Sequence, residues 1–141
     1  MSLGREVRTD YATAGLSLKK HPVALVRSVL SQRDVITAAD LQNTPNGHWV
    51  RVAGLVLIRQ RPGTASGIVF ETLEDETGSM NLIIRPDVYD RYRVASRHAA
   101  LAQADGWVER QGQVVHVMVK RIHDLSALLE EGFELRSRDF H

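Results

Sequence analysis

The stretch VRVAGLVLIRQRPGTASGIVFETLEDETGSMNLII, residues 50–84, decides which fold this chain of 141 residues can adopt. Apolar residues recur in it at a period of two, which is typical of β-strands. Its first strand is apolar on both faces around Gly54, which predicts a doubly buried strand with a bulge or sharp bend at the glycine. The loop RPGTASG and the tight turn ETG separate this strand from two more. The stretch therefore predicts strand, loop, strand, turn, strand.

The residues after this stretch add a helix and a hairpin. Residues 86–101 open with Pro86 and place apolar residues at helical spacing, which predicts a helix between the third and fourth strands. Residues 101–125 read as two strands with a turn around 110–112. This order of elements is that of the five-stranded OB-fold barrel, a mainly β fold that binds oligonucleotides through its second and third strands and two of its loops.

Short helices are expected on either side of the barrel. HPVALVRSVLSQRD places Pro22 where a helix can start, and Thr37 is a plausible N-cap for a second short helix. LSALLEE predicts a short helix near the other end. We therefore expect an N-terminal helical and linker segment over residues 1–46, the barrel over 47–124, and a C-terminal helix and tail over 125–141.

The composition excludes several classes of protein. With 43% hydrophobic residues, 25% charged residues and a net charge of +1, the chain resembles an ordinary globular protein. The chain has no cysteine, which excludes disulfides, thiolate catalysis and cysteine-bound zinc. No apolar run approaches the roughly 20 residues that span a bilayer, and the N-terminus does not read as a secretory signal. We expect a cytoplasmic protein with no membrane partner.

The charged and nucleophilic residues do not form a recognisable active site. Four acids fall within residues 71–76, but at a strand end and turn acids are usually solvated, with Asp75 or Thr77 bonding turn amides and Gly78 supplying a positive φ. The six histidines lack ligand spacing, and the serines lack the context of a nucleophile. The loop RPGTASG lacks the lysine of a phosphate-binding P-loop. The sequence predicts no catalytic residue, metal or cofactor.

Binding fits the sequence better than catalysis. Residues 51–66 contain three arginines and no acid. Arg59 and Arg61, two apart on an extended strand, should project to the same side, where paired guanidiniums can meet successive phosphates. Gln60 and Thr64 offer neutral hydrogen bonds. Phe70 is open to two interpretations, as a core residue or as a platform on which a base stacks.

Four stretches of the chain resemble one known family. They are GLSLKKHPVALVR, the string of residues 50–84, VVHVMVKRIHDLS and the terminal SRDFH. They are similar to the C-terminal region of bacterial error-prone DNA polymerases, the paralogues of the DNA polymerase III alpha subunit used in damage-induced mutagenic synthesis. In that family an aromatic residue usually precedes the proline after the third strand. Here Arg85 stands there, which suggests a phosphate contact or an arginine stacking plane.

The resemblance implies a non-catalytic fragment of a polymerase, because that family's metal-binding aspartates lie far upstream of this region and nothing here matches them. Its expected partner is the single-stranded DNA template. The alternative is a docking module for accessory proteins of translesion synthesis, for which Leu57, Val69 and Ile83 are candidates if they are exposed. An anticodon-type domain of a tRNA synthetase is a third, less favoured interpretation. The predicted nucleic-acid-binding residues are Arg51, Arg59, Gln60, Arg61, Thr64, Phe70 and Arg85.

Overall fold

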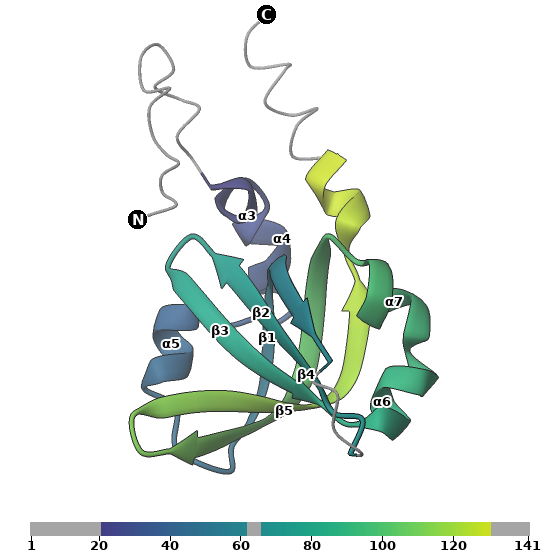
Figure 1. Cartoon of the computed structure of the whole chain (residues 1–141). Helices are drawn as coiled ribbons and strands as arrows, with labels where there is room; N and C mark the ends of the chain where they lie inside the picture. Colours follow the sequence, from purple (N-terminus) through teal and green to yellow (C-terminus); the bar gives the residue numbers. More distant parts are fainter. Residues whose placement is uncertain (1–20, 62–65, 131–141) are drawn as a thin grey trace, which may run out of the picture.

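The structure is a computed structural model that describes residues 21–61 and 66–130, and at its centre is a closed barrel (Figure 1). The barrel strands are β1 (Trp49–Gln60), β2 (Val69–Asp75), β3 (Gly78–Ile84), β4 (Leu101–Gln111) and β5 (Val114–Asp124). They follow one another around the barrel in the order β1-β2-β3-β5-β4, and β4 pairs with β1 to close it. All pairs are antiparallel except β3 with β5. This topology confirms the predicted OB-fold.

The first strand is long because it pairs with both β2 and β4. Gly54 is needed for close approach, since a Cβ there would lie 2.7 Å from the backbone oxygen of Glu74 on β2. The irregularity in register, however, falls between Val56 and Ile58. Of the bulge or sharp bend predicted at the glycine, the bulge lies a few residues further along the strand. The glycine lets β2 come close, and the strand changes register beyond it.

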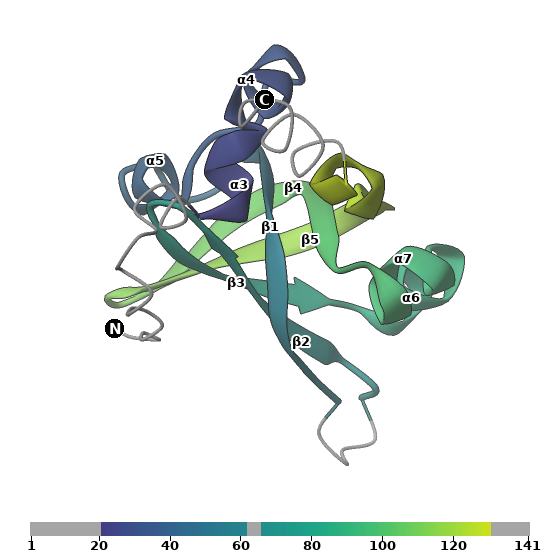
Figure 2. The same cartoon turned by 90° about the horizontal axis from the view of Figure 1, so that it is seen from above.

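Short helices flank the strands in the described part of the chain (Figures 1 and 2). They are α3 (Pro22–Leu25), α4 (Arg27–Gln32), α5 (Ala38–Gln42), α6 (Pro86–Arg91) and α7 (Arg93–His98). The predicted helices are present, but the first breaks at Val26 and the one after β3 breaks at Tyr92, both with non-helical backbone angles. Residues 126–130 are helical as well. Among the described residues no helix is long and apolar enough to cross a membrane.

Buried apolar residues form two separate cores. The larger fills the barrel and includes Leu73 and, at every second position of β3, Met80, Leu82 and Ile84. The smaller lies outside the barrel, where α3 and α4 pack on β1 and β4. Its buried members are Val23, Val26, Leu30, Val35, Ala53 and Leu101. Figure 1 shows these helices at the top of the barrel, with the β2–β3 turn beside them and β5 crossing the lower side.

Candidate nucleic-acid interface

One row of outward-facing residues crosses every strand of the barrel. In the strand registers Gln60 pairs with Phe70, Phe70 with Ile83, Ile83 with Met118, Met118 with Trp107, and Trp107 with Trp49. Directly opposed residues share a face of a sheet. We call these six residues the cross-strand row. It runs from the end of β1 around the barrel to the start of the same strand.

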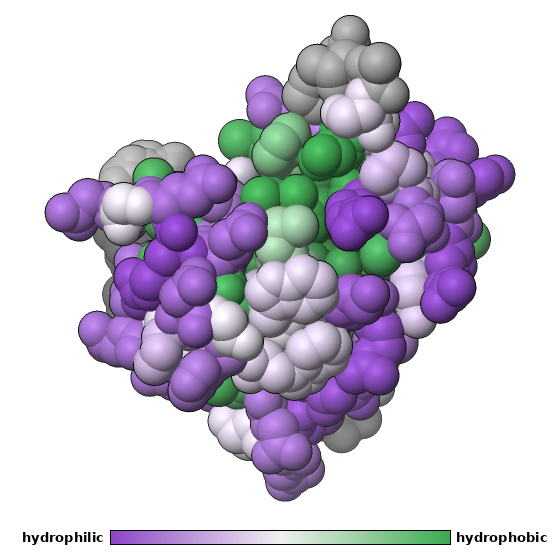
Figure 3. All heavy atoms as spheres, turned by 90° about the horizontal axis from the view of Figure 1, so that it is seen from below, coloured by the Kyte–Doolittle hydropathy of each residue, from purple (hydrophilic) through white to green (hydrophobic). Residues whose placement is uncertain are grey.

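The row is a surface and not part of a core. Phe70 is 37% exposed and Trp49 is 54% exposed. Ile83, Met118 and Trp107 are half-buried, and of the described residues that form the two hydrophobic cores none belongs to the row. In the view from below, apolar (green) and neutral (white) residues gather in the middle of the face between hydrophilic (purple) flanks (Figure 3). The sequence left open whether Phe70 is a core residue or a surface residue, and in the structure its ring is exposed.

Two of the predicted cations lie near the Phe70 end of this row. Arg61 is exposed just after β1, with its guanidinium carbon 4.4 Å from the centre of the Tyr89 ring on α6. The Arg85 side chain is 63% exposed and lies 4.0 Å from Asp87. Gly67, at the end of the β1–β2 loop, lies close to Pro86. Both arginines are thus held at the mouth of this loop. The predicted contact at Thr64 lies outside the described residues.

The other two predicted arginines form hydrogen bonds to other parts of the chain. Arg51 Nε donates to Asp105 Oδ1 at 2.8 Å, and its Nη1 donates to the backbone oxygen of Arg33 at 2.8 Å. Arg59 donates to the backbone oxygens of Ser96 at 2.8 Å and Ala99 at 2.5 Å, near the end of α7. Arg59 and Arg61 therefore both turn towards the α6–α7 side. A DNA contact by Arg51 or Arg59 would have to compete with these bonds.

Glu71 was not singled out in the sequence, although its environment is unusual. It is 1% exposed and lies directly opposite Arg59, whose Nε is 3.4 Å from its Oε2. Neither carboxylate oxygen of Glu71 has a hydrogen-bond partner among the described residues. Burial raises the pKa of Glu71 to about 7, against the opposing effect of Arg59. The signal in the sequence was an acid at an inward position of β2, between the buried Val69 and Leu73.

Two cations missing from the predicted set stand at the other end of the row. Lys120 Nζ lies 5.8 Å from the centre of the Trp107 ring, and Arg121 Cζ lies 5.5 Å from the centre of the Trp49 ring. Asp105, which is 1% exposed, accepts from Arg121 Nε at 3.2 Å. The sequence shows KR on β5 and a tryptophan on β4, but their proximity depends on the β4–β5 register, which has an irregularity at Asp105.

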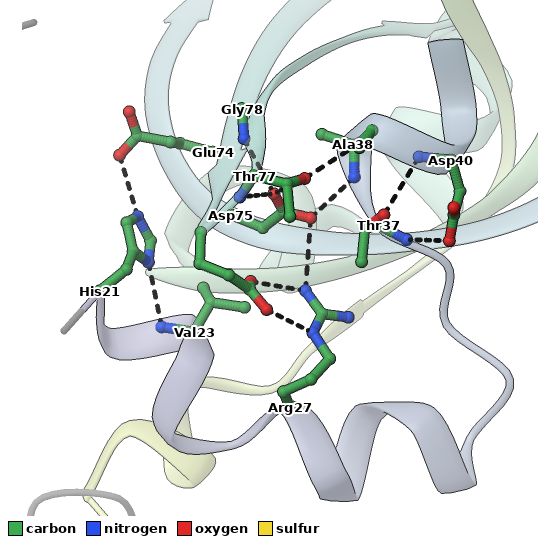
Figure 4. A network of polar contacts seen from close by, with 12 residues as sticks. His21, Val23, Arg27, Thr37, Ala38, Asp40, Glu74, Asp75, Thr77 and Gly78 are labelled. Carbon is green, nitrogen blue, oxygen red and sulfur yellow. Dashed lines mark hydrogen bonds and ion pairs between the residues drawn. The ribbon is translucent and has the colours of Figure 1, made fainter. Parts of the chain in front are cut away.

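The acids at the β2–β3 turn are not solvated as predicted (Figure 4). Asp75 is 2% exposed; its Oδ2 accepts from the backbone nitrogen of Ala38 at 2.8 Å and from Arg27 at 3.3 Å. Its Oδ1 accepts from the turn amides of Thr77 and Gly78, as expected for this residue. The prediction failed because α5 begins against this turn and brings its free amides to the carboxylate.

The second acid of this turn holds an N-terminal helix. Glu76 accepts from both Nε and Nη2 of Arg27 at 2.7 Å, and this bidentate pair lowers the pKa of Glu76. Glu74 meets His21 Nε2 at 3.0 Å, while His21 Nδ1 accepts from the backbone nitrogen of Val23. Figure 4 shows these side chains reaching from the turn to α3 and α4. The acids of this turn therefore hold α3 and α4 against the barrel.

The three apolar docking candidates differ in their exposure. Leu57 is 52% exposed, Ile83 is half-buried, and Val69 is 3% exposed and belongs to the barrel core. Val69 is therefore removed from the docking surface that the sequence suggested. In the described part of the chain, no group of three or more histidines, aspartates or glutamates is close enough together to hold a metal ion.

The sequence comparison matches nearly the whole chain to one kind of protein. The chain is 49% identical to "Error-prone DNA polymerase" of Anaeromyxobacter dehalogenans, covering 99% of this chain and 12% of that protein. The Pseudomonas aeruginosa protein of that name is 46% identical, with 99% and 14% covered. "Error-prone DNA polymerase 3" of Agrobacterium fabrum is 41% identical, with 99% and 13% covered. The chain thus spans about an eighth of these relatives, and no protein-family model matches it.

Solved structures share the barrel at low sequence identity. Asparaginyl-tRNA synthetase from Pyrococcus horikoshii superposes with a TM-score of 0.55 at 19% identity, covering 65% of this chain and 23% of that chain. An OBody bound to hen egg-white lysozyme gives 0.53 at 19% identity, covering 65% and 91%. At this level of identity the likeness concerns the fold alone, and it agrees with the barrel described above.

Proposed function

Since this chain belongs by sequence to the bacterial error-prone DNA polymerases and spans only a small part of their length, we propose that it is a non-catalytic segment that contacts the single-stranded DNA template. Nucleotide addition is then the work of the remainder of the longer polymerase. The segment acts in the cytoplasm, where the polymerase copies damaged DNA, and it needs no cofactor of its own.

The observation that carries this proposal is the exposed ring of Phe70 in the cross-strand row. A base can stack on an exposed aromatic ring whatever its sequence, and such a contact contributes about 1 to 3 kcal/mol. Gln60 lies next to Phe70 in the strand register and offers hydrogen bonds. Arg61 and Arg85 supply positive charge at the mouth of the adjacent loop, where phosphates would pass.

The test is a titration of fluorescein-labelled oligothymidylate with the 141-residue chain at low salt, followed by anisotropy. Phe70→Ala should weaken binding by about 5- to 150-fold, the equivalent of one lost stacking contact. Val94→Ala is the control, because Val94 is 69% exposed and lies on α7, outside the row. An intact chain that binds no oligonucleotide at low salt would contradict the proposal.

The arginines give a matched comparison of salt dependence. Arg61→Ala should flatten the slope of log affinity against log salt by about 0.7, the value of one phosphate contact on a single strand. Arg59→Ala should leave this slope closer to that of the wild type, because the Arg59 guanidinium is bound to the carbonyls of Ser96 and Ala99. Equal losses of slope would mean that Arg59 leaves these carbonyls to bind DNA, as the sequence alone predicted.

A second candidate function is docking of accessory proteins of translesion synthesis, favoured by the exposure of Leu57 on β1. This function predicts that a purified accessory protein binds the chain and that Leu57→Asp abolishes the complex. Under the leading proposal Leu57→Asp changes oligonucleotide affinity only modestly, because Leu57 does not belong to the cross-strand row.

A further inference from the structure

Trp49 and Trp107 lie together at the end of the cross-strand row that is remote from Phe70. They are direct partners in the β1–β4 ladder, where opposed residues have Cβ atoms about 5 Å apart. Met118, on β5, is the next partner of Trp107 and continues the surface towards β3. The two indole rings therefore belong to one surface, although they are 58 positions apart in the sequence.

A structural role in a core does not account for these two tryptophans. Trp49 is 54% exposed, more than Phe70, and the described members of both hydrophobic cores include neither indole. Large exposed aromatic rings are uncommon on a surface that binds nothing, because the apolar area they leave in water is costly. A ligand with flat, apolar faces would cover them.

Both rings have a cation beside them. Lys120 approaches Trp107, and Arg121 approaches Trp49, at distances within the range of a cation–π contact. Arg121 is held in place by the buried carboxylate of Asp105, which also binds Arg51. Lys120, Arg121 and Arg51 thus face two acids, Asp105 and Asp34. The end of the row thus combines aromatic rings with net positive charge, the pairing typical of a single-stranded nucleic-acid site.

An open hollow adjoins this end of the row. It is lined by Asp34, Ile36, Thr44, Trp49, Val50 and Arg51. The lining offers an aromatic ring, a guanidinium, and carboxylate and hydroxyl oxygens. These groups can stack on a base and hydrogen-bond to its edge. The hollow provides room for a nucleotide beyond the last ring of the row.

We propose that Trp49 and Trp107, with Lys120 and Arg121, form a second stacking platform that carries single-stranded DNA from Phe70 around the barrel to the start of β1. The inference rests on the proposed function, since it extends the same template path. Five spacings of about 4.8 Å separate the strands along the row, an arc of roughly 24 Å. Sites of this size fall within the range of about 4 to 16 nucleotides per OB-fold.

The chain contains a built-in probe, because Trp49 and Trp107 are its two tryptophans. Titration with unlabelled oligothymidylate of 12 residues should quench the intrinsic fluorescence as bases stack on the indoles. Parallel anisotropy with the labelled oligomer measures binding anywhere on the chain. Quenching that saturates together with the anisotropy supports the platform. Binding by anisotropy without quenching overturns it and leaves the proposed function intact.

Variants separate the two ends of the row. Trp49→Ala should lower the affinity of the chain for the 12-mer about 5- to 150-fold. It should have little effect on a dinucleotide, which is too short to reach from Phe70 to Trp49. Phe70→Ala should weaken binding of the 12-mer, but the complex that still forms should quench the tryptophan fluorescence as the wild-type complex does. Trp107→Phe retains an aromatic ring in this half-buried position and should keep most of the affinity while losing part of the signal.

The remaining outcomes also decide the matter. If Trp49→Ala binds 12-mers as tightly as Val94→Ala does, the platform is excluded. If an accessory protein quenches the fluorescence and DNA does not, the tryptophans belong to a protein interface and the inference fails. If the wild type shows no anisotropy change with any oligomer at low salt, the proposed function fails as well.

Discussion

The two ends of the β2–β3 hairpin differ in what surrounds their polar and charged groups. At the turn, Asp75 and Glu76 are bound to Arg27 and to the start of α5. At the open end, Phe70 is exposed and the Arg85 side chain, just beyond β3, remains largely in solvent. The number of charged residues in a stretch of sequence therefore does not tell how many of them a partner can contact. At the turn, the charged side chains are already bound to other parts of the chain and stabilise the fold.

The largest effect should follow from Asp75→Ala at the turn. The substitution leaves Arg27 without one of its two acids and the backbone amide of Ala38 without an acceptor. Removing one partner from a buried pair costs about 3 to 5 kcal/mol. Urea unfolding followed by circular dichroism should show this loss in the free energy of unfolding.

Asp87→Ala is the control for this substitution. The Asp87 side chain is 75% exposed and lies 4.0 Å from Arg85, so its removal should change stability by no more than about 0.5 kcal/mol. If both variants lose the same stability, the contrast between the two ends of the hairpin is wrong.

The next effect concerns Glu71, which lies between the two ends. Its folded-state pKa of about 7 is above the ordinary value of 4.5, so the folded chain keeps a proton that the unfolded chain releases. Stability from this group is greatest below about pH 4.5 and falls as the pH rises to about 7, by roughly 3 kcal/mol. Glu71→Gln cannot ionise and should lose less stability than the wild type between pH 5 and pH 8.

Chemical denaturation at several pH values provides this measurement. Two parallel curves of stability against pH would show that Glu71 is ionised at ordinary cost, with Arg59 balancing its charge fully. The same experiment with Glu74→Gln is the control, because Glu74 is half-buried and bound to His21 at the turn.

A smaller loss of stability is expected from a substitution at the start of α5, the helix whose first amide binds Asp75 of the turn. The Thr37 hydroxyl accepts from Asp40 N and forms a capping box with it. Thr37→Ala should therefore cost about 1 kcal/mol. Thermal unfolding compared with Ser31→Ala, an exposed position in α4, measures the difference. An equal melting temperature for the two variants would show that Asp75 alone orients this helix.

The smallest effect on stability is expected at the open end. Arg85→Ala removes an exposed side chain and should change the free energy of unfolding by at most about 0.5 kcal/mol. It should flatten the salt slope of oligonucleotide binding by about 0.7. A variant that loses stability but retains this slope would reverse the contrast between the two ends.

The fold was predictable because its signals are local. Alternation around Leu82 marks a strand facing the core, Thr37 marks a helix start, and Pro86 marks the helix between β3 and β4. Each signal involves residues within a few positions of one another. The order of the elements then leaves few topologies, of which the closed barrel is one.

The candidate site was only partly predictable because it depends on contacts between distant segments. Phe70 could be core or surface until the β2–β3 register placed it opposite Ile83. Nothing near Arg59 in the sequence indicates that the carbonyls of α7 would hold it. Lys120 was overlooked for the same reason, since its position beside Trp107 depends on the β4–β5 ladder.

The cross-strand row also changes level along β1 as it crosses the barrel. It begins and ends on β1, at Trp49 and Gln60, which are 11 residues apart along the strand. At about 3.3 Å per residue, roughly 36 Å of coiled strand lies between the two ends, because the strands of a barrel are staggered as they close. The row therefore does not close on itself, because it starts and ends at different positions on β1. A polymer that follows it crosses the strands in turn and returns to β1 at a different level, so that it does not meet itself.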